Sequence, residues 1–283
     1  MSNGGPGEQG NTASASATAD LWNTSTPNVA RIYDYYLGGK DNYAPDREAA
    51  RKVLGHAPDV PLAALENREF LRRAIQFLIE EAGIRQFIDI GPGLPTQGSV
   101  HEIAWRHDPQ ALVAYVDNDP VVLAHGRAIL QAASRVRIVE GDVRRPEGIL
   151  ASVELRELID LSRPVGLCMS LVLHFVTEDE DPYGCLATLR DALAPGSYLV
   201  LTHVTGDERD VGTVSEITAV YDTATAPLIP RSRAQVTRLF DGFELVEPGV
   251  VFSSQWRPTG EYYARGGTRW AYAGVGRKPE TCL

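Results

Sequence analysis

The sequence has few cysteines, no excess of basic residues and no long apolar run. Its three cysteines, Cys168, Cys185 and Cys282, lack the close pairing of a zinc site or redox motif, which favours reduced thiols. No apolar run is long enough to span a bilayer, and the first residues lack the basic start and apolar centre of a secretion signal. We therefore expect a cytoplasmic protein with no membrane partner.

Net positive charge is also lacking, since the formal net charge is −10. An acidic chain repels phosphate backbones, so we expect no nucleic-acid partner. The four successive acids at 178–181 fan out along the chain, which favours a solvated loop over a metal site. The sequence thus indicates neither a nucleic-acid substrate nor a metal.

Strand patterns alternate with helix patterns over most of the 283 residues. The strands are apolar on both faces, as in a parallel sheet covered on both sides. This order predicts an α/β fold with a seven-stranded, mainly parallel sheet and helices on both faces. The seven strands are expected at residues 86–90, 111–116, 136–140, 165–171, 198–204, 243–246 and 270–275.

The N-terminal part divides into two expected segments ahead of a main domain at residues 67–283. Residues 1–24 are small and polar and predict a disordered tail. Residues 25–66 predict a helical segment, with Thr26 as N-cap, Pro27 at the first helical position and Gly38-Gly39 as the stop. Its apolar face fits an amphipathic helix with a glycine cap, whereas its density of Tyr, Asn, Arg and Lys fits a ligand-facing segment.

A glycine turn follows the first expected strand and carries the clearest functional signal. Asp89 ends the strand, and Gly91 and Gly93 would let a ligand approach bare backbone. Asp117 and Asp142 follow the next two strands. Because ligands bind at the carboxyl ends of parallel strands, these acids predict a nucleoside site, with Asp117 on ribose hydroxyls and Asp142 on an adenine amine.

Two kinds of nucleoside cofactor compete for such a turn. A dinucleotide fingerprint requires glycine at the sixth position, where this chain has Thr96, and Pro95 offers no amide to a phosphate. The spacing therefore disfavours NAD and an oxidoreductase. It favours a ligand with one nucleoside and no phosphate.

Several motifs together resemble those of the class I S-adenosylmethionine-dependent methyltransferases. They are Asp89-Ile90-Gly91-Pro92-Gly93, the acidic segments at 117–120 and 141–143, and the segments at 170–175 and 193–200. Residues 27–43 further resemble the N-terminal signature of a bacterial S-adenosyl methyltransferase family, formerly known only as a domain of unknown function. The resemblance implies a Rossmann-like fold, S-adenosyl-L-methionine as cofactor and an N-terminal helical lid.

The resemblance also implies roles for individual residues. Gly91, Gly93 and Asp89 would contact the methionine part of the donor, and Asp117 its ribose. Asn118, Asp142 and Val143 would hold the adenine, while Ser170 and Leu171 would lie beside the sulfonium. The lid would add Asn28, Arg31, Tyr33, Tyr36, Gly38, Gly39 and Lys40.

Some of these roles have a competing interpretation. Tyr33 and Tyr36 could present ring faces to the cationic sulfur. Arg31 or Lys40 could meet the methionine carboxylate, or could instead pair with Asp34 or Asp41.

The catalytic assignment is His174, which follows the fourth strand and has an unperturbed pKa near neutrality. A packing role for His174 is the alternative, and His203 and Tyr221 are further candidates for the acceptor pocket. The chain is thus expected to methylate a small-molecule acceptor. A non-catalytic module that binds S-adenosylmethionine or S-adenosylhomocysteine would need the same residues and is the alternative function.

Overall fold

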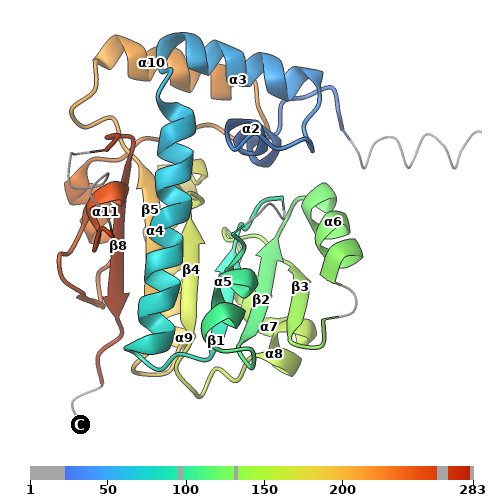
Figure 1. Ribbon diagram of the computed structural model, residues 1–283, viewed down its shortest axis with the longest axis vertical. Helices are drawn as coiled ribbons and strands as arrows, with labels where there is room; N and C mark the ends of the chain where they lie inside the picture. Colours follow the sequence, from blue (N-terminus) through green and yellow to red (C-terminus); the bar gives the residue numbers. More distant parts are fainter. Residues whose placement is uncertain (1–22, 95–97, 131–132, 260–266, 281–283) are drawn as a thin grey trace, which may run out of the picture.

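A computed structural model describes residues 23–94, 98–130, 133–259 and 267–280. Most of the expected tail, the turn residues Pro95 and Thr96, and Cys282 lie outside these ranges. Within them, the α/β fold is confirmed (Figure 1).

The sheet has strand order β3-β2-β1-β4-β5-β8-β6, with β7 also paired to β8. Its first five strands are parallel, and β6, β7 and β8 form the antiparallel part. The described sheet therefore has eight strands where seven were expected, because β7 has only two residues and no alternating pattern to reveal it. The strands are β1 (Gln86–Ile90), β2 (Leu112–Asp117), β3 (Val136–Glu140), β4 (Gly166–Ser170), β5 (Tyr198–Val204), β6 (Glu244–Leu245), β7 (Val251–Phe252) and β8 (Ala271–Arg277).

Each face of the sheet has its own hydrophobic core, because successive strand side chains point to opposite faces. Phe87 packs with α4 (Val60–Glu80) and α5 (Val100–His107) on one face. Ile88 packs on the other face, which is covered by α7 (Pro146–Ala151), α8 (Val153–Leu158), α9 (Pro182–Ala192) and α11 (Arg233–Arg238). Helix α6 (Pro120–Leu130) packs on the edge strand β3.

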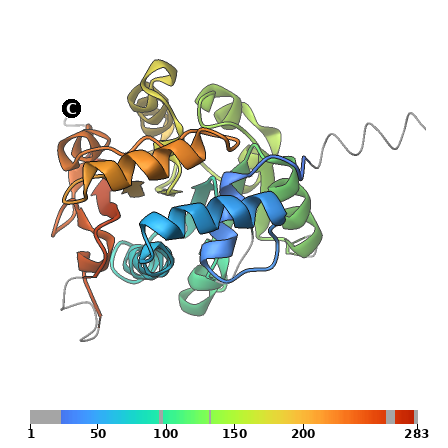
Figure 2. The same ribbon diagram turned by 90° about the horizontal axis from the view of Figure 1, so that it is seen from above.

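Three helices lie across the carboxyl end of the sheet (Figures 1 and 2). They are α2 (Val29–Tyr36), α3 (Ala44–His56) and α10 (Val211–Tyr221), and α3 contacts both of the others. A third hydrophobic cluster joins them to the start of α4 through Ile32, Val53, Ala64 and Ile217. The chain therefore places a helical roof, defined here as α2, α3 and α10, over the strand ends.

Three expected helix boundaries were wrong. Helix α2 begins at Val29, because Asn28 and not Thr26 provides the cap and accepts the Ala30 and Arg31 amides at 2.9 and 3.2 Å. The apolar pattern from Asn67 onwards predicts a long helix that ends at Gly83. This helix, α4, begins earlier, at Val60, since Pro61 sits in its first turn, where no amide donor is needed. The boundary expected between residues 66 and 67 thus falls inside α4.

A third difference lies at residues 149–161, for which the sequence predicts a single helix, whereas the structure has the two helices α7 and α8. Ser152 has extended backbone geometry, and its hydroxyl caps α8 by accepting from the Leu155 amide at 3.2 Å. Across the described ranges, no helix combines the length and apolar character that a membrane span requires.

Candidate functional site: a cavity under the helical roof

A cavity of about 440 Å³ lies between the carboxyl ends of the strands and the helical roof. Four of the expected site residues are absent from its lining: Arg31, Gly38, Gly39 and Lys40. The expected residues that do line it are Asn28, Tyr33, Tyr36, Asp89, Gly91, Gly93, Asp117, Asn118, Asp142, Val143, Ser170, Leu171 and His174.

The glycine turn after β1 forms the floor of the cavity. Gly91 has a φ of 64° and donates its amide to the Val116 carbonyl at 2.8 Å, which ties the turn to β2. A Cβ on Gly91 would lie 2.5 Å from Val172 Cγ2, whereas a Cβ on Gly93, at φ 68°, would meet only Ala30 Cβ at 3.7 Å. Gly91 therefore leaves room for the β4 loop, and both glycines adopt a left-handed backbone.

Gly91→Ala is expected to destabilise the protein more than Gly93→Ala. Both variants incur the left-handed backbone cost of about 1–2 kcal/mol, and only Gly91→Ala also displaces Val172. Urea unfolding of the two variants measures the difference. Gly148→Ala, in the exposed part of α7 with open space around its Cβ, serves as control and should be neutral or stabilising. Equal losses at Gly91 and Gly93 would contradict the packing role.

Two carboxylates face the cavity from neighbouring strand ends. Asp89 is 5% exposed, and burial raises its pKa to about 7, with the charge of Asp117 adding to the rise and that of Arg68 opposing it. Burial also raises the pKa of Asp117 to about 6, although its carboxylate accepts the Asp119 amide at 2.9 Å and the Gly93 amide at 3.4 Å. Burial therefore disfavours the ionised forms of both acids, and a bound cation or hydroxyl donor would stabilise these forms.

Asp142 behaves differently from these two acids. Its carboxylate accepts hydrogen bonds from the Arg144 guanidinium, the shortest at 2.6 Å, and from Asn118 Nδ2 at 3.3 Å. These contacts, with Arg144 as the largest cause, lower the pKa of Asp142. Arg144 also pairs with Glu180 at 3.0 Å. The edge of the cavity at β3 is thus a fixed ionic network.

A chain of neutral hydrogen bonds crosses the cavity beside β4. Asn67 Nδ2 donates to Tyr33 Oη at 3.0 Å and to Ser170 Oγ at 3.1 Å. Ser170 Oγ lies 3.2 Å from Thr202 Oγ1, which accepts the Leu171 amide at 3.0 Å. Leu171 itself has a φ of 57°, an uncommon value for a residue other than glycine. This series of hydrogen bonds connects the roof, α4 and two strands through the buried side chain of Asn67.

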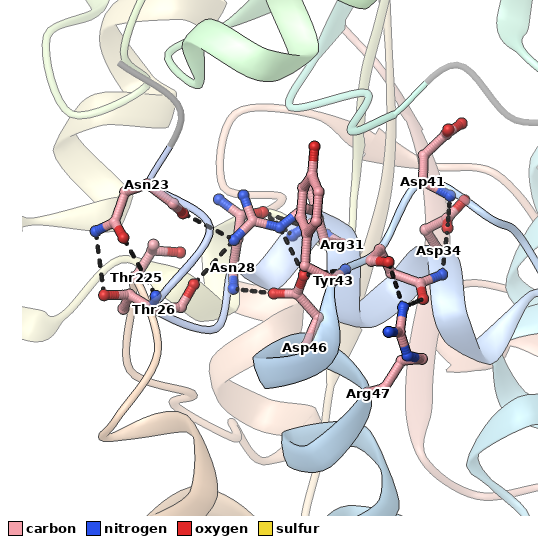
Figure 3. Close-up of polar contacts among 12 residues, drawn as sticks. Asn23, Thr26, Asn28, Arg31, Asp34, Asp41, Tyr43, Asp46, Arg47 and Thr225 are labelled. Atoms are coloured by element: carbon pink, nitrogen blue, oxygen red, sulfur yellow. Dashed lines mark hydrogen bonds and ion pairs between the residues drawn. The ribbon is translucent and has the colours of Figure 1, made fainter. Parts of the chain in front are cut away.

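Figure 3 shows how polar side chains hold the first roof helix in place. Arg31 forms a buried ion pair with Asp46 at 2.7 Å, with side chains 3% and 0% exposed. It also donates to the carbonyls of Asn23 and Thr26 at 3.1 and 2.9 Å. Its partner is thus neither Asp34 nor Asp41. The guanidinium joins α2 to α3 and does not face the cavity.

Asn28 connects this anchor to the cavity. Its backbone amide donates to Asp46 Oδ1 at 2.8 Å, and its side-chain amide donates to Asp119 Oδ2 in the loop after β2. Asp119 in turn caps the start of α6 through the Val121 amide at 2.7 Å. The roof is thereby fixed to the strand end that carries Asp117.

The Gly38-Gly39 turn encloses Asp34. A Cβ on Gly39 would overlap the Asp34 carboxylate, which accepts hydrogen bonds from the Asp41 amide at 3.0 Å and from Asn42 Nδ2 at 2.8 Å. Lys40 is exposed on this turn. These residues build the end of α2 away from the cavity.

His174 lies in the cavity wall after β4 and is 3% exposed. Burial, together with the nearby His203 and Arg231, lowers its pKa well below the usual value, so the ring is neutral. Its Nδ1 has no hydrogen-bond partner among the described residues.

Arg231 positions the segment that carries His174. Its guanidinium, which is 1% exposed, donates to the carbonyls of Leu173 and Val176 at 2.8 and 2.9 Å and pairs with Glu178 at 2.8 Å. It also donates to His203 Nε2 at 2.9 Å, which places His203 behind the wall and outside the cavity lining. The loop after β4 is therefore held from behind.

The chain is similar to known proteins over nearly its whole length. A family model described as S-adenosyl methyltransferase matches residues 15–279. The chain belongs to the S-adenosyl methyltransferase family. This S-adenosyl methyltransferase uses S-adenosyl-L-methionine as its methyl donor.

Solved structures agree with this assignment. A provisionally assigned methyltransferase from Thermobifida fusca YX is 38% identical, with a TM-score of 0.86 over 92% of this chain and 98% of that one. A DUF574 family protein from Streptomyces avermitilis MA-4680 is 39% identical, with a TM-score of 0.85 over 90% of this chain and 99% of that one.

A more distant structure shares only the fold. The trans-methyltransferase CalH in complex with S-adenosylhomocysteine is 16% identical, with a TM-score of 0.51 over 87% of this chain and 72% of that one. None of the curated proteins compared matches the chain.

Three cavity residues of the methyltransferase were missed by the sequence analysis. Asn67 and Arg68 line the cavity from the middle of α4, where the helix pattern marks only the apolar face. Arg144 follows Asp142 by two residues, and an acid with a nearby arginine was the one signal that could have indicated an ion pair there. Arg68 is the cation next to Asp89. Arg31 or Lys40 had been expected to meet the methionine carboxylate, and neither of them lines the cavity.

Proposed function

We propose that this methyltransferase transfers the methyl group to a small-molecule acceptor that binds in the same cavity as the donor. The observation that carries the proposal is the shape of the cavity. It extends from the acids at the ends of β1, β2 and β3 to the ends of β4, β5 and β8, and the helical roof covers it. A cavity covered by a roof on one side suits a small molecule better than a polymer chain.

The residues at the ends of β1, β2 and β3 would hold the donor. The bare backbone of the glycine turn allows the donor to approach closely. The two buried acids with raised pKa offer hydrogen-bond acceptors, Asp89 for an ammonium group and Asp117 for ribose hydroxyls. Asn118, Asp142 and Val143 would line the adenine pocket. Arg68, beside Asp89, would meet a carboxylate.

S-adenosyl-L-methionine supplies a methyl carbon already activated by a positive sulfur. The chain then has to position the acceptor and exclude water, and the roof does both. His174 is neutral and lies in the wall after β4, so it could accept a proton from an acceptor that loses one. Tyr33, hydrogen-bonded to Asn67, presents its ring from the roof.

Asp117→Ala is expected to weaken binding of S-adenosylhomocysteine by about 1–3 kcal/mol, because it removes buried hydrogen bonds to the ribose. Titration calorimetry measures the affinity. Methyl-labelled donor with a metabolite extract measures transfer, and label is expected in the fraction of low molecular mass and to fall with the variant.

The matched control is Asp160→Ala, an acid in an exposed loop before β4 and outside the cavity. It should leave both affinity and transfer unchanged. Unaltered affinity in Asp117→Ala would remove the ribose assignment. Label that enters only protein or nucleic acid would contradict the small-molecule acceptor.

A further inference from the structure

The charges that line the cavity are segregated along the sheet. Asp89 ends β1, Asp117 and Asp119 follow β2, and Asp142 and Arg144 follow β3, with Arg68 beside Asp89. In the sheet order, these three strands lie together on one side of β4. Among the described residues, the six charged side chains that line the cavity therefore all belong to its donor end.

The opposite end of the cavity has an uncharged wall. Among the described residues, no Asp, Glu, Lys or Arg lines it next to β4, β5 and β8. Its lining comes from the loop after β4, the ends of β5 and β8, and the roof. The large apolar and aromatic members are Tyr36, Phe175, Ile217, Tyr221, Leu228 and Trp270.

Three aromatic side chains of this wall, Tyr36, Phe175 and Tyr221, contact one another. The rings of Phe175 and Tyr221 have centroids 6.1 Å apart at 36°, and the hydroxyls of Tyr36 and Tyr221 lie 3.5 Å apart. The rings thus present faces and edges suited to another ring.

Three titratable groups of this wall, Tyr36, His174 and Tyr221, are neutral at pH 7. Burial raises the pKa of Tyr221 to about 12 and that of Tyr36 well above its usual value, and it lowers the pKa of His174. The Arg209 guanidinium lies over the Trp270 ring at 4.0 Å and is paired with Asp59 at 3.1 Å, and neither of these two residues lines the cavity. A charged ligand would find no counter-charge here.

We propose that the methyl acceptor is an uncharged, largely apolar ring compound that binds against this wall. The proposal rests on the proposed function and specifies its acceptor. Burying a charged group without a partner is costly, whereas a flat apolar ring gains contact with four aromatic side chains. Charge therefore distinguishes the two ends: the cationic donor binds among acids, and the acceptor binds where there are none.

Three probes with one ring system test this inference. 1-Naphthol, 1-naphthoate and 1-naphthylmethylammonium are neutral, anionic and cationic at pH 7. Each is titrated by calorimetry into the protein saturated with S-adenosylhomocysteine. The neutral probe is expected to bind at least about tenfold more tightly than either charged probe. Equal or tighter binding of a charged probe, or no binding of any probe at 1 mM, would overturn the inference.

A charge placed in the wall provides a second measurement. Thr218 lines the cavity from α10 and is only partly buried, so Thr218→Lys should fold and should increase the affinity for naphthoate relative to naphthol. Ser215→Lys puts the same charge on an exposed position of the same helix and should leave the ratio unchanged. An equal shift in both variants would contradict the assignment.

The saturation step keeps the two proposals separate. If S-adenosylhomocysteine does not bind, the donor site is wrong. If S-adenosylhomocysteine binds and a charged probe binds as tightly as the neutral probe or more tightly, only the proposal of an uncharged acceptor is wrong.

Discussion

Asp46→Asn is expected to lower the free energy of unfolding by about 3–5 kcal/mol, because it leaves the buried Arg31 charge without its partner. The Asp46 carboxylate also accepts the backbone amides of Asn28 and Tyr43, both at 2.8 Å. One side chain thus fixes the starts of α2 and α3 together. Urea unfolding of the full chain measures the loss.

The same helix offers the matched control for this variant. Glu48→Gln makes the same acid-to-amide change two residues later, where Glu48 pairs with Lys52 at 3.1 Å and both side chains are largely exposed. An exposed pair of this kind is expected to contribute less than about 0.5 kcal/mol. If the two variants lose similar stability, the anchoring role of Asp46 is wrong.

Loss of the anchor should also reach the donor site. The backbone amide of Asn28 donates to Asp46, and its side-chain amide donates to Asp119 in the loop that follows Asp117. At a temperature where the Asp46→Asn protein remains folded, its affinity for S-adenosylhomocysteine is therefore expected to fall, whereas Glu48→Gln should bind normally. Unchanged affinity would show that the anchor serves stability alone.

Asp89→Asn is expected to gain stability relative to the native chain as pH rises, by roughly 3 kcal/mol between pH 5 and pH 8. The pKa of Asp89 is raised from 3.8 to about 7, so through most of this window the folded chain holds a proton that the unfolded chain has lost. The native chain therefore loses stability as pH rises towards 7, at about 1.4 kcal/mol per unit, and the amide variant does not. Urea unfolding at each pH measures the difference.

Two further variants frame this result. Asp117→Asn should show a smaller gain that ends at a lower pH, because the pKa of Asp117 is raised only to about 6. Asp160→Asn should show none, because the pKa of this exposed acid is lowered, and it is ionised in both states above pH 5. If the difference in unfolding free energy between Asp89→Asn and the native chain does not change with pH, the raised pKa of Asp89 is wrong.

The raised pKa of Asp89 also has a consequence for donor binding. A bound ammonium group would favour the ionised carboxylate, so donor binding would release a proton near neutral pH. The ligand that the site is proposed to hold would thus offset the cost of burying the Asp89 charge.

Local features of the sequence were enough to predict the acids and the glycine turn. In a parallel sheet the carboxyl ends of successive strands meet at one edge, so Asp89, Asp117 and Asp142 could be brought together from strand positions alone. The predicted limits of β3 and β5 match the structure, because each strand is a short apolar run that can be recognised within its own segment.

The roof could not be predicted in the same way. The partner of Arg31 is Asp46, fifteen residues away, whereas Asp34 and Asp41 are both nearer in the sequence. Which acid a buried arginine meets depends on how α2 packs against α3, and the helix pattern does not encode that angle. Asn67 was overlooked likewise, because its contacts with Tyr33 and Ser170 join three separate segments.

By itself, the sequence determined the parallel sheet and the order of its strand-end acids, because these depend on periodicity within single segments. The methyl donor was implied by the resemblance of the chain's motifs to those of the S-adenosylmethionine-dependent methyltransferases. Only the tertiary structure decided which residues cover the cavity and which part of its lining carries no charged side chain. Trp270, Tyr221 and Phe175 are far apart in the chain, and they form one uncharged wall only because β8, α10 and the loop after β4 pack together. Packing between distant segments is set by the whole core and not by any one of them.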